Sequence, residues 1–181
     1  MNQPDQYRIK DNGVFPGNEL PVLHYKKVLR LPWFFPSRYA RKIMESHGWT
    51  NTWRNGIYTY DHYHSNTHEA MAVISGHTTL LLGGENGTQL TLQKGDVIVL
   101  PAGVAHRNRG RMKDVICVGA YPEGKDFDMN YGHAGERPTA DKNIAAVTVP
   151  AKGPLYGKAD PLIAIWKNHK KPVQNLYRKR S

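Results

Sequence analysis

The chain has 181 residues, of which 39% are hydrophobic and 22% charged, a length and composition that suit one globular domain with its own core. Its lone cysteine, Cys117, excludes an intramolecular disulfide framework, and the apolar run around it favours a buried structural thiol over a reactive one. The N-terminal sequence has no signal-peptide pattern, and no apolar run approaches the roughly 20 residues that span a membrane. We therefore expect a cytoplasmic protein without a membrane partner.

The net charge of +10 lies in the two flanks of the chain. Residues 1–55 carry nine Lys and Arg against four Asp and Glu, residues 56–121 carry five of each, and residues 122–181 carry eleven against six. The terminal run Arg178-Lys179-Arg180 can attract nucleic acid or anionic surfaces without specificity. No helix-turn-helix, zinc-finger or aromatic RNA-binding signature accompanies this charge. A solvated C-terminus is the favoured interpretation, and no specific nucleic-acid partner is expected.

Residues 1–52 predict an arm, a strand and a helix that pack on the rest of the domain. The first 20 or so residues are polar with several Pro and Gly, which indicates an arm rather than a core element. Residues 22–31 predict a strand. A helix is expected from Pro36-Ser37 to about His47, capped by Ser37 and ended by Gly48.

Residues 53–121 have the pattern of an antiparallel β-domain. Short apolar runs recur about every 8–12 residues, and each is bounded by turn residues, which favours a sandwich or barrel. Residues 122–181 are irregular and rich in Pro and Gly, so we expect them to complete or cover the same domain rather than form another. Within them, residues 144–149 and 162–166 are candidates for edge strands or for a cover over the barrel.

Two histidines one strand repeat apart are the first candidate site. In a strand, side chains at i and i+2 share a face, so His62 and His64 point the same way, with Tyr58 and Tyr60 behind them. Two imidazoles on one face can chelate one cation. The turn-forming residues 65–67 then allow Glu69 to begin the next strand and face back toward the histidines.

The residues around this pair extend the candidate site. His68 must face away from its neighbour Glu69, so it is not expected to be a ligand. His106 follows an apolar strand and a Pro-Ala-Gly turn and is a candidate fourth ligand. Met71 and Val73 lie two and four residues after Glu69, so in a strand they face the same side, and they are expected to form the apolar wall of a pocket.

The two segments that carry these residues resemble the two motifs of the cupin family. The first motif is Gly, five residues, His-X-His, four residues, Glu, six residues, Gly, and the second is Gly, five residues, Pro-X-Gly, two residues, His. The matching positions are Gly56, His62, His64, Glu69 and Gly76 in the first, and Gly95, Pro101, Gly103 and His106 in the second. The family expects Asn four residues after the last His, where this chain has Gly110, with Asn108 two residues early. That departure puts in doubt the turn after the last motif strand.

The resemblance implies a fold, a metal and a range of activities. The implied fold is all-β, a double-stranded β-helix (jelly-roll) barrel, here with a short N-terminal helix and an irregular C-terminal extension. The implied site is one divalent transition metal per chain, bound by His62, His64, Glu69 and His106, and commonly in a homodimer. Nitrogen and oxygen ligands without thiolate suit Fe, Mn, Ni, Co, Cu or Zn. Segments 119–122 and 154–157 resemble a family of bacterial single-domain cupins without an assigned reaction.

Three classes of function remain open at this point. The complete ligand set favours a metal-dependent enzyme of dioxygenase, isomerase or decarboxylase type that acts on a small oxygen-rich or acidic organic substrate. A non-catalytic small-molecule or metal-sensing module is the alternative, and a nucleic-acid-associated protein is the third. Tyr60, one strand repeat from His62, is the one catalytic candidate beyond the ligands, although a role for Tyr58 and Tyr60 as barrel-lining core residues is favoured over it.

Overall fold

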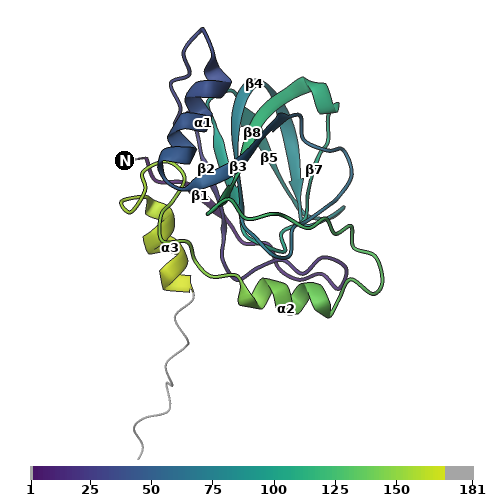
Figure 1. The fold of residues 1–181 in the computed structure, drawn as a ribbon. Coiled ribbons are helices and arrows are strands. Elements are labelled where there is room, and N and C mark those ends of the chain that lie inside the picture. Colours follow the sequence, from purple (N-terminus) through teal and green to yellow (C-terminus); the bar gives the residue numbers. More distant parts are fainter. Residues whose placement is uncertain (1, 170–181) are drawn as a thin grey trace, which may run out of the picture.

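Antiparallel strands dominate the computed structural model, which describes residues 2–169 (Figure 1). The strands within this range are β1 (Asp5–Tyr7), β2 (Val22–Tyr25), β3 (Trp49–Asn55), β4 (Glu69–Leu82), β5 (Thr88–Gln93), β6 (Val97–Leu100), β7 (His106–Asn108) and β8 (Val115–Pro122). The helices are α1 (Pro36–Ser46), α2 (Thr139–Ala146) and α3 (Pro161–His169), with a short 3-10 turn, η1 (Met112–Asp114). No helix among the described residues is long and apolar enough to cross a membrane.

The long strand β4 belongs to two sheets and thereby closes the barrel. Its first half lies between β6 and β8 in the order β1-β2-β6-β4-β8-β3, and its second half pairs with β5 and β7. The strand changes sheets at a register shift between Val73 and Ser75, next to Gly76. Gly76 has φ +75°, and a Cβ there would lie 1.9 Å from the carbonyl oxygen of Asp114. Only glycine fits at this bend.

Alternation along β4 separates the barrel interior from an outer apolar layer. Met71 and Val73 belong to the interior cluster, which contains residues of both sheets. Ala70 and Ala72 belong to the outer cluster, which also contains buried residues of α1 and α3. Figure 1 shows these two helices on one side of the barrel. The all-β barrel predicted from the sequence is therefore confirmed, and Glu69 begins β4 with the inward parity of Met71.

The N-terminal segment contributes residues to the core, whereas the sequence indicated an arm that packs on the domain rather than a core element. β1 pairs with β2, and Ile9, Phe15 and Leu20 are buried. The strand expected over residues 22–31 ends already at Tyr25. The chain turns there because Lys27 has φ +46° and its N–H donates to Oδ1 of the buried Asp96.

Helix α1 confirms the expected helix but begins differently. Phe35, in the left-handed conformation with φ 55°, precedes the helix, and no side chain caps its first turn. Ser37 lies inside the helix, and its hydroxyl accepts a 3.0 Å hydrogen bond from Nε of Arg54. The predicted Ser37 cap was therefore wrong. Ala40 and Met44 form the buried face of the helix.

The C-terminal segments predicted as strands or cover are helices. Residues 144–149 overlap the end of α2, and residues 162–166 lie within α3. Leu162 and Trp166 are buried in the outer cluster, so α3 covers the barrel. Asp160 precedes α3 and holds this segment, because its carboxylate accepts hydrogen bonds from the Tyr25 hydroxyl at 2.6 Å and from the N–H of Leu162 at 3.1 Å. The basic run 178–180 lies outside the described residues.

Candidate metal centre

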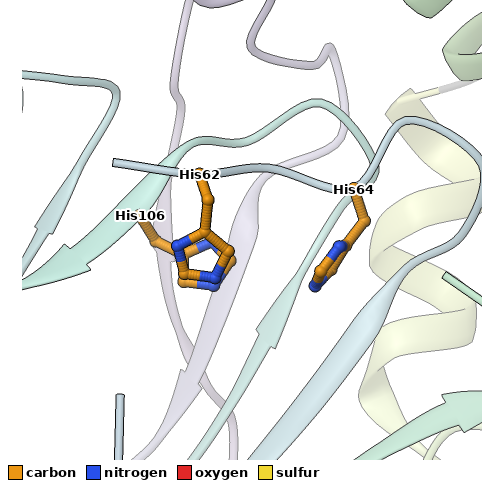
Figure 2. Close-up of side chains that lie close together, drawn as sticks. All are labelled: His62, His64 and His106. Carbon is orange, nitrogen blue, oxygen red and sulfur yellow. The ribbon is translucent and has the colours of Figure 1, made fainter. Parts of the chain in front are cut away.

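The three candidate histidines converge on one point, although only one of them lies on a regular strand (Figure 2). Their ligand atoms all lie within 4.8 Å of one another. His106 begins β7, and His62 pairs with it through an isolated bridge in which the N–H of His106 donates to the carbonyl of His62 at 2.9 Å. The predicted strand around His62 and His64 was wrong, but this bridge fixes the segment so that both rings face the same point.

Backbone carbonyls orient all three imidazoles in the same way. Nδ1 of each ring lies against a carbonyl oxygen: His62 against Tyr60 at 3.2 Å, His64 against Asp128 at 2.6 Å, and His106 against Val104 at 3.2 Å. An Nδ1 in this position carries the hydrogen and donates it. Nε2 of each ring is then left with a free lone pair, which is the arrangement of a histidine metal ligand.

Glu69 completes the cluster from the first position of β4. Its Oε1 accepts a 2.7 Å hydrogen bond from the Tyr121 hydroxyl, which in turn accepts one from Nε1 of Trp53 at 2.9 Å. Its Oε2 lies 3.5 Å from Nε2 of both His64 and His106. The four predicted ligands are therefore brought together. Sequence reasoning missed Tyr121 and Trp53, because they come from β8 and β3.

The pKa values in this cluster keep Glu69 charged. Burial raises the pKa of Glu69, but His64, His106 and the Tyr121 hydroxyl outweigh burial and hold it at about 2. Burial, helped by His62, lowers the pKa of His106 to about 3, and burial also lowers the pKa of His62. Burial works against a charge on His64 as well, yet Glu69 raises its pKa. At neutral pH the centre thus offers one carboxylate and two neutral imidazoles, those of His62 and His106, while Glu69 favours the protonated form of His64 until a cation replaces the proton.

The donor set fits a divalent transition metal. Oε2 of Glu69 is buried and has no hydrogen-bond partner among the described residues. A buried carboxylate oxygen without a hydrogen bond is costly unless a cation satisfies it. Three imidazole nitrogens and one such oxygen, without thiolate, are ligands of Fe, Mn, Ni, Co, Cu and Zn.

A cavity of about 250 Å³ adjoins the candidate ligands. Apart from the ligands, its lining residues are Asn51, Thr52, Trp53, Arg54, Asn55, Gly56, Ile57, Tyr58, Met71, Tyr121, Phe127 and Met129. The Phe127 ring stacks on Tyr121 with centroids 4.8 Å apart and lies 4.9 Å from the His64 ring. Met71 forms part of the apolar wall, as predicted. Val73 belongs to the interior cluster but does not line this cavity.

Tyr58 and Tyr60 are exposed beside the centre, so the prediction that they are core residues was wrong, although Tyr58 does line the cavity. They are 37% and 45% exposed, and their rings stack 4.9 Å apart. The Tyr60 ring centroid lies 5.7 Å from that of His62, but Tyr60 does not line the cavity. Loss of water contact, together with Tyr58, raises the pKa of Tyr60, so its hydroxyl stays neutral. The catalytic candidate Tyr60 is placed near the ligands but outside the cavity.

His68 and Asn108 have structural roles near the centre. His68 is buried away from the ligands, where its Nδ1 accepts a 3.0 Å hydrogen bond from the N–H of Ala102 and its ring lies 4.6 Å from Trp166. Asn108 holds the turn after β7, because its Oδ1 accepts from the N–H of Gly110 at 2.7 Å and its Nδ2 donates to the carbonyl of Arg111. Asn108 thus stabilises the turn after β7, although Gly110 stands where the family has its Asn.

Comparison with known proteins places these features in a family. The model of the cupin domain matches residues 52–117. The chain is 36% identical over 161 residues to the uncharacterised protein YjlB of Bacillus subtilis (strain 168), and the alignment covers 88% of this chain and 94% of that one. Similar solved structures include an acireductone dioxygenase of Bacillus anthracis with cadmium in its active centre, at 16% identity and a TM-score of 0.43 over 72% of this chain and all of that one. Another is an oxalate decarboxylase of Bacillus subtilis with Mn(II) centres, at 17% identity and a TM-score of 0.36 over 70% of this chain and 30% of that one.

Proposed function

The chain belongs to the cupin family, and from that premise we propose that it is a metal-dependent enzyme whose single divalent metal is bound by His62, His64, Glu69 and His106. One observation carries the proposal. Every imidazole is oriented through its Nδ1 by a backbone carbonyl, and the carboxylate keeps one buried oxygen that has no hydrogen-bond partner among residues 2–169. This arrangement pre-organises four ligand atoms and leaves a cation as the group that would satisfy them.

The metal, when bound, supplies Lewis acidity or redox chemistry next to the cavity. Four protein ligands leave coordination positions of a six-coordinate ion open toward a substrate. Three neutral imidazoles and one carboxylate leave a net charge of about +1 on a divalent centre. Such a centre attracts oxygen-rich or anionic groups.

The cavity limits the substrate to a small organic molecule. A cavity of about 150 Å³ is enough for a benzene ring, so about 250 Å³ admits one ring or a short chain with a few oxygen atoms. Arg54 is the one cationic side chain among the described lining residues, and Asn51 and Asn55 add amide groups on the same strand. Phe127 and Met71 provide apolar surface that excludes water. We infer a small, oxygen-rich or acidic substrate.

The lining residues also favour some reactions over others. Among the described residues that line the cavity, there is no carboxylate or imidazole apart from the four ligands. The Tyr121 hydroxyl donates to Glu69 and is thereby occupied. An isomerisation needs a general base to move a proton, and the Tyr58 hydroxyl is the one such group among the described lining residues besides the ligands and Tyr121. Oxygenation at the centre fits these residues better, because decarboxylation also has to replace carbon dioxide with a proton.

The lack of a carboxylate or imidazole beyond the four ligands among the described lining residues also favours the second candidate, a non-catalytic small-molecule or metal-sensing cupin. The two candidates differ in turnover alone. Both require a metal at the same four residues and a small ligand in the same cavity.

The test is turnover by the metal-loaded protein. We would load the protein separately with Fe(II) and Mn(II), and follow oxygen uptake with catechols, diketones and thiols and carbon dioxide release from small dicarboxylic acids. Turnover that is lost in His106→Ala and kept in His77→Ala, an exposed histidine, supports the enzyme. Ligand-induced changes in the spectrum of the metal without turnover of any compound support the sensing module instead.

A further inference from the structure

Three consecutive aromatic side chains project from the loop between β2 and α1. Trp33, Phe34 and Phe35 are 86%, 75% and 76% exposed, and we name them the aromatic tip. In Figure 1 the segment between β2 and α1 rises at the top, beyond the end of the barrel. Large apolar side chains that stay exposed next to one another commonly mark an interaction surface.

The aromatic tip is held in place by its flanks. Leu29 is buried in the outer cluster, and Leu31 packs against the same cluster. Pro32 and Pro36 border the tip, and Phe35 adopts the left-handed conformation that turns the chain into α1. Proline fixes its own backbone angle, and a bulky residue rarely adopts a positive φ unless its surroundings require it. The tip is therefore a defined feature of the fold.

Cations surround the aromatic tip with little opposing charge. Residues 26–54 contain seven Lys and Arg and one carboxylate, Glu45. Arg30, Arg38 and Lys42 are exposed, and none of them forms an ion pair with a carboxylate among residues 2–169. Arg38, Lys42 and Arg54 also line, with Phe35, a groove of about 700 Å³ beside the tip. We name Arg30, Arg38 and Lys42 the cationic rim.

We propose that the aromatic tip and the cationic rim dock the protein on an anionic lipid surface. Trp and Phe are favoured at the boundary between lipid headgroups and acyl chains, and Lys and Arg beside them attract anionic headgroups. The positive charge of the cationic rim complements a negative surface, and this favours anionic lipid as the partner that covers the aromatic tip. A second copy of the chain on the same patch would bring the two rims together, and their like charges would repel.

The shape of the patch separates a membrane from nucleic acid. Single-stranded nucleic acid is bound in grooves where bases stack on aromatic faces. Trp33 and Phe34 do not line the groove beside the tip, so a strand in that groove could stack on Phe35 alone. The loop that carries the tip rises beyond the end of the barrel (Figure 1), where its side chains can insert between headgroups. The expectation of no membrane partner rested on the absence of a spanning segment, which peripheral docking does not require.

Docking in this orientation would also affect how close the metal cavity lies to the lipid surface. Arg54 lines both the groove beside the tip and the cavity at the candidate ligands. Docking would therefore bring the β3 side of the cavity close to the lipid surface. The proposal does not depend on the proposed enzymatic function, because it rests on residues outside the ligand set.

The experiment measures co-sedimentation of the full-length protein with vesicles of phosphatidylglycerol and phosphatidylcholine, against vesicles of phosphatidylcholine alone. We expect salt-sensitive binding to the anionic vesicles only. Trp33→Ser/Phe34→Ser and Arg38→Gln/Lys42→Gln should each weaken this binding by about tenfold. Lys10→Gln/Lys142→Gln makes the same charge change at two exposed residues outside the patch and should leave binding unchanged.

Tryptophan fluorescence provides a second readout. Trp49 and Trp166 are buried and Trp53 is partly buried, whereas Trp33 is exposed. A blue shift on addition of anionic vesicles should therefore come from Trp33. Trp33→Phe should lose the shift while it keeps most of the binding.

Four outcomes would overturn the proposal. The first is that the wild-type protein does not bind anionic vesicles. The second is that Arg178→Gln/Lys179→Gln/Arg180→Gln abolishes binding while the tip variants keep it, which would assign binding to the C-terminal run. The third is that Trp33→Ser/Phe34→Ser converts a dimer to a monomer in light scattering, which would mean that a second copy covers the tip. The fourth is that single-stranded DNA, but not vesicles, binds in a tip-dependent manner.

Discussion

The Tyr121 hydroxyl donates a 2.7 Å hydrogen bond to Oε1 of Glu69, and this contact determines which carboxylate oxygen faces the histidines. Oε2 is left 3.5 Å from Nε2 of His64 and of His106 and has no hydrogen-bond partner among the described residues. Trp53 in turn donates to the Tyr121 oxygen. A chain of two hydrogen bonds therefore positions the one anionic ligand of the centre.

Removal of this hydroxyl should weaken metal binding without loss of the fold. In Tyr121→Phe the carboxylate loses the bond that orients it, so we expect metal affinity to fall by about 10- to 100-fold. Competition with a chelator of known affinity measures this change. Tyr39→Phe, which removes the hydroxyl of an exposed tyrosine on α1, is the control and should bind metal as the wild type does. Equal affinity in the two variants would contradict the orienting role of Tyr121.

His68 should matter for stability and not for metal. His68→Ala removes the acceptor of the Ala102 N–H and the ring that packs on Trp166. We expect the free energy of unfolding to fall by about 1–3 kcal/mol because a buried donor loses its partner, while metal content stays that of the wild type. Urea unfolding and metal analysis of the same preparation check both parts. Loss of metal with unchanged stability would place His68 among the ligands instead.

Glu136 should contribute to the loss of stability in acid. Partial burial disfavours its charge, but the N–H groups of Tyr131 and Gly132 and the Tyr63 hydroxyl outweigh burial and lower its pKa. A lowered pKa means that the stabilisation is present above the unfolded-state pKa and is lost as pH falls through the folded-state pKa. The free energy of unfolding of Glu136→Gln should therefore depend less on pH than that of the wild type below about pH 4.5. If the free energy of unfolding, measured with urea, falls equally steeply with pH in the variant and the wild type over that range, the assignment is refuted.

Asp160 should be a main source of stability for the C-terminal segment. Its buried carboxylate accepts four hydrogen bonds, from the Tyr25 hydroxyl and from the N–H groups of Leu155, Tyr156 and Leu162. Asp160→Ala leaves these donors unpaired and should cost about 3 kcal/mol of unfolding free energy. Asp5→Ala breaks an exposed ion pair with Lys26 and should cost less than about 1 kcal/mol. Similar losses in the two variants would show that Asp160 does not hold this segment.

Three of the four ligand positions could be predicted from local spacing, and His106 from its match to the second cupin motif. His62 and His64 are two residues apart, and Glu69 follows after one turn. The strand expected for the two histidines is absent, however, and the bridge between His62 and His106 aligns them instead. Tyr121 and Trp53 could not be assigned in this way, because their contact with Glu69 depends on the pairing of β8 with β4 and β3. The carbonyl of Asp128, which orients His64, comes from an irregular segment that has no periodic signal at all.

The C-terminal helices show a different limit of sequence reasoning. Residues 162–166 are a continuous apolar run, and such a short run does not distinguish a buried strand from a buried helix. The pair Asp160-Pro161 carried the missing signal, because Asp at the cap and Pro at the first position are typical of a helix start. The N-terminal segment was misjudged for a related reason: its buried residues, such as Ile9 and Phe15, are isolated among polar residues.

Metal analysis of protein purified without chelator tests the central claim most directly. The wild type and His77→Ala, which alters an exposed histidine, should each retain a divalent transition metal at up to one equivalent per chain. The double variant His62→Ala/His64→Ala should retain almost none, because two of the four proposed ligands are gone. Equal metal content in the double variant and the wild type would contradict the assignment of the centre to His62, His64, Glu69 and His106.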